Sequence, residues 1–170
     1  MESDKIVLFF KRTLMIILIF LMQTVFADKV RMFGVSPNFA LAYILVVSFK
    51  NHENYGFYAA LILGLLTDSV SGRVFGSYTA VFLIIEETIK YGYKKLFAEN
   101  FFFECMGGLF FNFVFSFLFA TVEWLFNGKF AATFLGVGLL ELIYNQIVFM
   151  LFLFISKKFG KKKRRSMFRI

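Results

Sequence analysis

The feature that most constrains this sequence is a series of long apolar runs separated by short polar segments. The two clearest runs lie at residues 101–126 and 130–155, and a helix needs about 20 mostly apolar residues to cross a bilayer. Of the 170 residues, 59% are hydrophobic and 28 are Phe, whereas soluble domains carry about 45–50% apolar residues. One small soluble core cannot bury this much Phe, Leu and Ile. We therefore predict an all-α polytopic membrane protein.

The apolar runs predict six transmembrane helices in a single transmembrane domain over residues 1–156. Pro37, the only proline, is expected in the first turn of the second helix, where its missing N–H costs nothing. The third run is short and stops at Asp68. A re-entrant or strongly tilted pair is therefore the alternative for the third and fourth segments. The six predicted spans cover residues 6–26, 34–49, 55–67, 74–91, 101–126 and 130–155.

The distribution of basic residues predicts the orientation of these helices. Six spans place both termini on the same side of the membrane. If both termini are cytoplasmic, 15 of the 19 Lys and Arg residues fall in cytoplasmic segments and four fall outside. This asymmetry is the one that the positive-inside rule describes, so we predict cytoplasmic termini.

Eight of the basic residues follow Ile155, and residues 157–170 form a predicted cytoplasmic tail. A basic residue next to anionic lipid contributes about 1 kcal/mol of binding free energy, so we expect the tail to contact anionic lipids. An acidic cytoplasmic partner is the alternative. Nucleic acid is not expected, because the Phe residues lie inside the spans. The residues expected to face lipid are Lys161, Lys162, Lys163, Arg164 and Arg165.

The sequence contains no positive sign of an enzyme, a metal site or a cofactor site. Cys105 and His52 are the only Cys and His residues and lie far apart in the chain, which argues against a thiol nucleophile or a His-ligated metal. Phosphate-binding loops, dinucleotide fingerprints, zinc-protease motifs and serine elbows are absent from the sequence. We therefore predict a non-enzymatic protein without a cofactor.

Glu141 is the most unusual single residue. Eleven uncharged residues precede it and fifteen follow it, so we expect it near the middle of the bilayer, where a charge costs at least about 2.5–3.5 kcal/mol. Asn145 lies four residues later on the same helical face, and Asn112 in the fifth span is a candidate partner. The favoured interpretation is a protonated Glu that joins two helices by hydrogen bonds. A proton or ligand site is the alternative.

Small residues recur at every fourth position of the third span and lead to an acid. Residues at this spacing let two helix backbones approach closely. The favoured interpretation is a packing seam inside the protein, and a docking face for a partner helix is the alternative. The stripe consists of Gly56, Ala60, Gly64 and Asp68.

Two groups of charged residues flank the fourth span. Asp68 opens a turn whose glycine permits a positive φ, and we expect its carboxylate to pair with Arg73 and thereby set the angle at which the fourth span enters. At the other end, we expect Glu86 and Glu87 at headgroup level, with Glu86 paired to Lys90 at the i,i+4 spacing.

Motifs in the second to fourth spans point to a family. They are the span-opening segment Gly34-Val35-Ser36-Pro37-Asn38-Phe39, the segment Gly64-Leu65-Leu66-Thr67-Asp68, and the glycines Gly72 and Gly76. This pattern resembles the rod shape-determining protein MreD family. The family has an acid where Asn38 stands and more often an apolar residue where Thr67 stands. The resemblance covers residues 34–80.

The resemblance implies a non-enzymatic inner-membrane component of the bacterial cell-elongation machinery. Members of this family associate with the shape protein MreC, and through it with MreB, RodA and the elongation-specific penicillin-binding transpeptidase. The resemblance also implies a fold similar to that of the substrate-binding subunits of energy-coupling-factor vitamin transporters.

That similarity of fold supplies the alternative function. A substrate-binding subunit needs a polar pocket open to the outside, and Asp68, Arg73 and Glu141 are placed to line one. Such subunits commonly carry an Ala-x-x-x-Ala seam in the first span. Residues 6–26 contain no Ala, which argues against this alternative.

Overall fold

The computed structural model describes residues 2–32, 34–50, 54–93, 101–128 and 138–167. This part of the chain is helical and carries no strand, apart from an isolated bridge between Met32 and Val35. The all-α prediction is therefore confirmed. The elements are α1 (Glu2–Leu21), the π-helix η1 (Met22–Phe26), α2 (Phe39–Phe49), α3 (Tyr55–Ser71), α4 (Ser77–Thr88), the π-helix η2 (Ile89–Tyr93), α6 (Phe101–Asn127) and α7 (Leu139–Met167).

Three helical segments of the described chain are long and apolar enough to cross a membrane. They are Ile6–Phe26, Phe101–Phe126 and Leu139–Lys158. Helices α2 and α3 are apolar but shorter, and α4 continues directly into η2. Each of the six predicted runs thus contains a helical segment. Only three of these described segments are long enough to count as candidate spans by length and composition.

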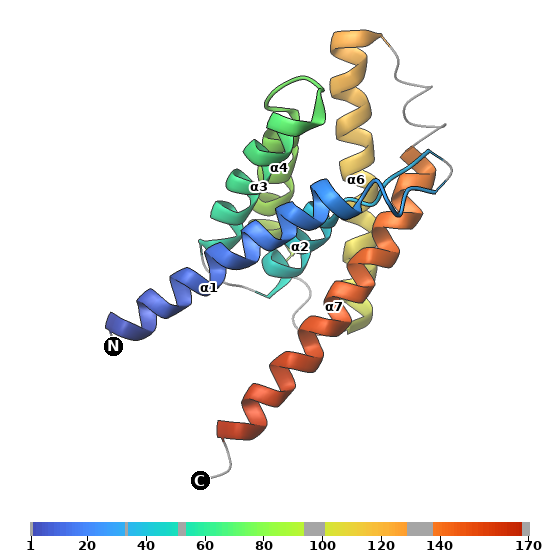
Figure 1. Cartoon of the computed structure of the whole chain (residues 1–170). Coiled ribbons are helices and arrows are strands. Elements are labelled where there is room, and N and C mark those ends of the chain that lie inside the picture. The colour runs from blue at the N-terminus through green and yellow to red at the C-terminus, as the bar shows by residue number, and fades with distance from the viewer. Residues whose placement is uncertain (1, 33, 51–53, 94–100, 129–137, 168–170) are drawn as a thin grey trace.

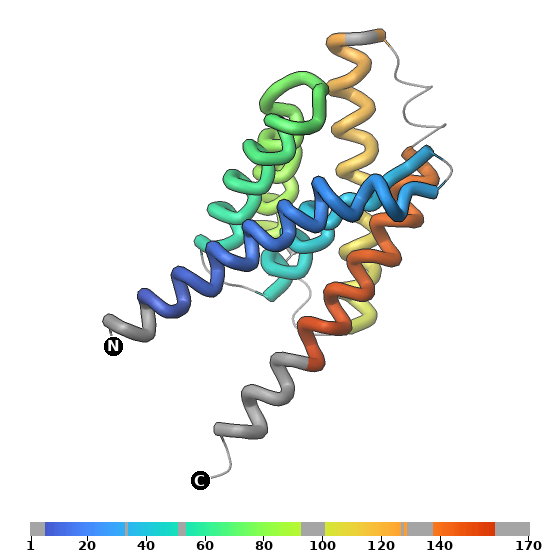
Figure 2. Tube along the Cα trace, viewed as in Figure 1, coloured from blue at the N-terminus to red at the C-terminus, as the bar shows by residue number. Residues whose placement is uncertain are grey.

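The helices form a bundle around α2. Helices α3 and α4 form an antiparallel hairpin, α7 packs against both α2 and α6, and α1 crosses the bundle obliquely (Figure 1). Nine of the eleven residues of α2 are buried, which explains why its sequence is apolar on all sides. The two termini lie at the same end of the bundle (Figure 2).

Helix α1 is the least covered of the long helices. Phe9 and Phe10 are each 66% exposed, and only 11% of its apolar window is buried inside the protein. In water such a surface would be an aggregation liability. An apolar outer surface of this kind is what a helix that faces lipid requires.

Two helix starts differ from the sequence prediction, one because of a capping side chain and the other because of a glycine with a positive φ. Pro37 does not lie in the first turn of α2. The helix begins at Phe39, and Asn38 is its N-cap, with a side-chain oxygen that accepts a hydrogen bond from the Leu41 N–H at 2.9 Å. Helix α4 begins at Ser77, three residues later than predicted, because Gly76 adopts a φ of 92° that a helix does not continue through.

The ends of α3 and α7 also differ from prediction. Helix α3 does not stop before Asp68 but continues to Ser71, where Gly72 ends it with a left-handed φ of 63°. Helix α7 continues to Met167, so the backbone of the basic segment 161–165 is helical and continuous with the last span. Residues 129–137 of the predicted sixth span lie outside the described residues.

Candidate functional site

The small-residue stripe of α3 faces α4. A Cβ atom added to Gly64 would lie 2.5 Å from the Cα of Thr79, and one added to Gly56 would lie 2.5 Å from Oε1 of Glu86. Ala60, between them, is fully buried. Because α4 occupies this face, the stripe forms a seam inside the protein and offers no surface to a partner helix.

The position of Glu86 differs from the prediction. Its side chain is 1% exposed and lies in the α3–α4 seam against Gly56. The predicted ion pair between Glu86 and Lys90 is therefore wrong. The Nζ atom of Lys90 lies 3.8 Å from Oε1 of Glu87 instead. The i,i+3 pair forms because Glu86 points into the protein and Glu87 points outward.

Asp68 continues the same seam and caps α4. Its Oδ1 accepts a hydrogen bond from the Tyr78 N–H at 2.9 Å, and its Oδ2 accepts from the N–H and the hydroxyl of Thr79 at 3.0 and 2.6 Å. The carboxylate, only 4% exposed, thus satisfies two of the N–H groups that a helix start leaves without partners, and it lies at the positive end of the helix dipole. Asp68 fixes the entry of α4 through backbone contacts.

The predicted ion pair between Asp68 and Arg73 is wrong. The guanidinium of Arg73 lies 4.8 Å from the ring centre of Phe119, and its Nη1 is 3.9 Å from Oε1 of Glu123. Arg73 therefore turns toward α6, whereas Asp68 turns toward the start of α4. Gly72 and Gly76 make this possible by reversing the chain with positive φ angles.

The span-opening motif forms a second buried polar connection. The Asn38 N–H donates to Oδ1 of Asn145 in α7 at 2.7 Å, and the Phe39 N–H donates to Oε1 of Gln23 in η1 at 2.7 Å. The side chains of Asn38, Gln23 and Asn145 thus accept hydrogen bonds from the backbone N–H groups at the start of α2. Pro37 contributes its carbonyl, which accepts from Nε2 of Gln23 at 3.4 Å.

Glu141 and Asn112 do not meet. Glu141 is half-buried and lies in the first turn of α7. Asn112, 1% exposed, donates to Oε1 of Gln146 at 2.9 Å, and Gln146 donates in turn to the carbonyl of Cys105 at 3.1 Å. The expected partnership of Asn112 with Glu141 is therefore wrong, because α7 presents Gln146 to Asn112 instead.

Two partners of these networks, Gln23 and Gln146, were not among the predicted site residues. Each is an uncharged amide inside an apolar run. The sequence alone could have identified both residues as candidates, because an amide in a membrane span requires a hydrogen-bond partner.

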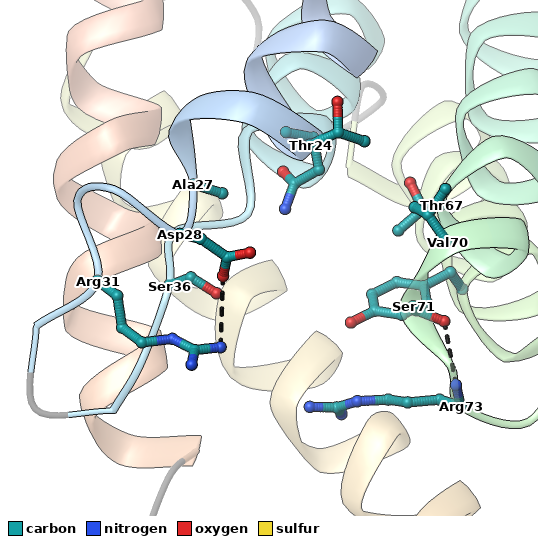
Figure 3. A pocket seen from close by; sticks show the side chains of 11 residues that line it. Thr24, Ala27, Asp28, Arg31, Ser36, Thr67, Val70, Ser71 and Arg73 are labelled. Atoms are coloured by element: carbon teal, nitrogen blue, oxygen red, sulfur yellow. Dashed lines mark hydrogen bonds and ion pairs between the residues drawn. The ribbon is translucent and has the colours of Figure 1, made fainter.

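A polar cavity of about 300 Å³ (Figure 3) is lined by η1 and the last turns of α3, which lie at the end of the bundle opposite the termini (Figure 1). Its walls come from η1 and the loop after it, the last turns of α3, and the start of α4. A smaller pocket of about 90 Å³ adjoins it and includes Glu141. The residues that line both are Gln23, Arg31, Ser36, Arg73 and Tyr78. Of the three residues expected to line a polar pocket, Arg73 and Glu141 line these two, and Asp68 lines neither.

The opposite end of the bundle carries charged side chains. Lys157 of α7 forms an ion pair with Glu104 of α6, and its Nζ lies 4.9 Å from the ring centre of Phe101. Burial lowers the pKa of Lys50 from its usual value; the nearby Glu104 carboxylate opposes this shift and Lys157 adds to it. The ion pair and the ring contact join α7 to α6. The side chains of residues 161–165 lie outside the described part of the chain.

Comparison with known protein families gives a match over nearly the whole chain. The family described as rod shape-determining protein MreD matches residues 3–163, so the resemblance first seen over residues 34–80 is confirmed and extended. No curated protein and no solved structure matches the chain. The expected similarity to transporter substrate-binding subunits, and the alternative function that it suggested, therefore have no support from these comparisons.

Proposed function

Because the chain belongs to the rod shape-determining protein MreD family, we propose that this membrane protein scaffolds MreC and the peptidoglycan synthases of the cell-elongation machinery. The observation that carries the proposal is the family match over residues 3–163. MreB, RodA and the elongation-specific transpeptidase are the further partners, reached through MreC. The proposed site of action is the bacterial inner membrane.

Rigidity of the bundle supports a scaffolding role. Asp68 joins α3 to α4, and Asn145 joins α7 to α2, each through buried hydrogen bonds. Buried polar links in a membrane protein restrict how helices slide and rotate, since a broken link leaves a polar group unsatisfied in an apolar setting. A body of this kind holds a bound partner helix at a constant angle.

The topology that accompanies the proposal has six spans and two cytoplasmic termini. Two observations support this topology. Each of the six predicted runs contains helix, and the two termini lie at the same end of the bundle (Figure 1). The test is cysteine labelling in a Cys105→Ser background with a maleimide that does not cross membranes. Lys29→Cys should be labelled from outside, and Ser3→Cys only after permeabilisation. Labelling of both in intact spheroplasts would refute the topology.

The functional test is depletion of the protein in its native bacterium, with cell outline and new-wall labelling as readouts. Rounded or swollen cells with dispersed wall synthesis are expected, together with co-purification of MreC with the wild-type chain. Unchanged shape after depletion would refute the proposed role. Changed shape without co-purification of MreC would refute the proposed scaffolding while leaving the shape role intact.

A further inference from the structure

The polar cavity combines features that point to an anionic ligand. Its volume of about 300 Å³ lies at the lower end of the range for small-molecule sites. Three separate parts of the chain build it, so folding rather than one loop shapes it. Hydroxyl and amide side chains dominate its walls, among them Gln23, Thr24 and Ser36.

Two guanidinium groups face this cavity from opposite sides. Figure 3 shows Arg31, from the loop after η1, and Arg73, from the turn after α3, pointing toward one another across it. Like charges that face a common space repel each other. An anion between them removes that repulsion and gains two charge-assisted contacts.

The carboxylates near these arginines leave most of their donors available. Arg31 lies 3.4 Å from Asp28, whose side chain is 74% exposed, and Arg73 lies 3.9 Å from Glu123. Both pairs are long, and the exposed Arg31–Asp28 pair contributes little. A guanidinium has five N–H donors, so each arginine keeps several for a ligand. Asp28 lines the cavity itself, whereas Glu141 lines only the adjoining pocket.

Tyr78 supplies an independent third donor. Its ring is held 4.7 Å from the ring of Phe119, centre to centre, and its side chain lines the cavity. Within the described part of the chain, the hydroxyl has no hydrogen-bond partner. A hydroxyl held in place by aromatic packing and lacking a protein partner is suited to bind a ligand.

We propose that this cavity binds a phosphate group, which Arg31 and Arg73 hold from opposite sides while the Tyr78 hydroxyl donates a third hydrogen bond. A phosphate presents several oxygens in a tetrahedral arrangement, which suits donors that converge from different directions. A planar carboxylate is served best by one arginine in a bidentate pair. The phosphate belongs either to the headgroup of a membrane lipid or to a soluble phosphorylated molecule.

The test uses the full chain in maltoside micelles, which contain no phosphate. Two probes are added separately: phosphatidylglycerol, followed by native mass spectrometry, and radiolabelled glycerol phosphate, followed by equilibrium dialysis. Binding of the lipid without binding of the soluble probe assigns the site to a headgroup, and the reverse assigns it to a solute. Failure of both probes to bind overturns the proposal.

Three variants and a matched control decide whether the cavity is the site. Arg31→Gln and Arg73→Gln should each weaken binding about tenfold or more, as expected when one charge-assisted hydrogen bond is lost. Tyr78→Phe keeps the ring packing and should weaken binding about threefold to tenfold. Lys29→Gln removes the same charge from the same loop without lining the cavity, and it should bind as the wild type does.

Equal weakening in Lys29→Gln and Arg31→Gln would show general attraction of charge and overturn the proposal. Wild-type affinity in Arg73→Gln would do the same. Thermal unfolding of each variant accompanies the binding measurement. Because Tyr78→Phe removes a single hydroxyl from a packed ring, it remains informative even if an arginine variant fails to fold.

Discussion

Substitution of Gly64 by Ala tests the α3–α4 seam most directly. The added Cβ would lie 2.5 Å from the Cα of Thr79, whereas ordinary van der Waals contact is 3.4–4 Å. The obstacle is backbone, which cannot rotate away, so the two helices must separate by about 1 Å at this crossing. Overpacking of this kind costs about 1–3 kcal/mol. Separation also stretches the hydrogen bonds that Asp68 makes to α4.

Gly56→Ala is the matched control on the same helix face. Its new Cβ would also lie 2.5 Å from an atom, but that atom is Oε1 at the far end of the Glu86 side chain. A flexible side chain can move at low cost, and both substitutions gain about 1 kcal/mol of helix propensity. Because the gain in helix propensity is the same in both variants, we expect Gly64→Ala to be less stable than Gly56→Ala by about 1–3 kcal/mol.

The assay is reversible unfolding in mixed micelles, with the transition followed by circular dichroism. Gly64→Leu should unfold earlier still, because its side chain is larger. The reasoning is refuted if Gly64→Ala is as stable as Gly56→Ala or more stable.

Three further predictions concern the buried polar links. Asp68→Ala removes the acceptors of the Tyr78 and Thr79 N–H groups at the start of α4 and should cost about 2–3 kcal/mol in the same unfolding assay; an unchanged transition would contradict its role as a cap. Asn145→Leu leaves the Asn38 N–H buried without its acceptor and should cost about 1–3 kcal/mol, whereas a neutral result would show that the link is dispensable. Glu141→Gln keeps the hydrogen-bonding capacity, so stability should change by less than about 0.5 kcal/mol, and the variant should complement a depletion strain. Loss of function at normal expression would favour a proton or ligand site instead.

The helical class and several element boundaries follow from local sequence patterns. The apolar run 101–126 and helix α6 (Phe101–Asn127) agree within a residue, because length and hydropathy suffice to define an isolated apolar helix. The spacing of Gly56, Ala60 and Gly64 likewise identified a face where helices approach closely. Such patterns depend on residues a few positions apart, which is the information that a single sequence carries.

What the sequence by itself determined, then, is an all-helical membrane protein of a recognisable family, with a close-packed face on α3. Only the tertiary structure decided which polar groups meet: Asp68 binds the start of α4 instead of Arg73, and Asn112 binds Gln146 instead of Glu141. Asn38 and Asn145 meet although 107 positions separate them. These pairings depend on how each helix is rotated and where helices cross. The packing of the whole bundle determines these rotations and crossing points. They cannot be read from the order of residues along a single helix.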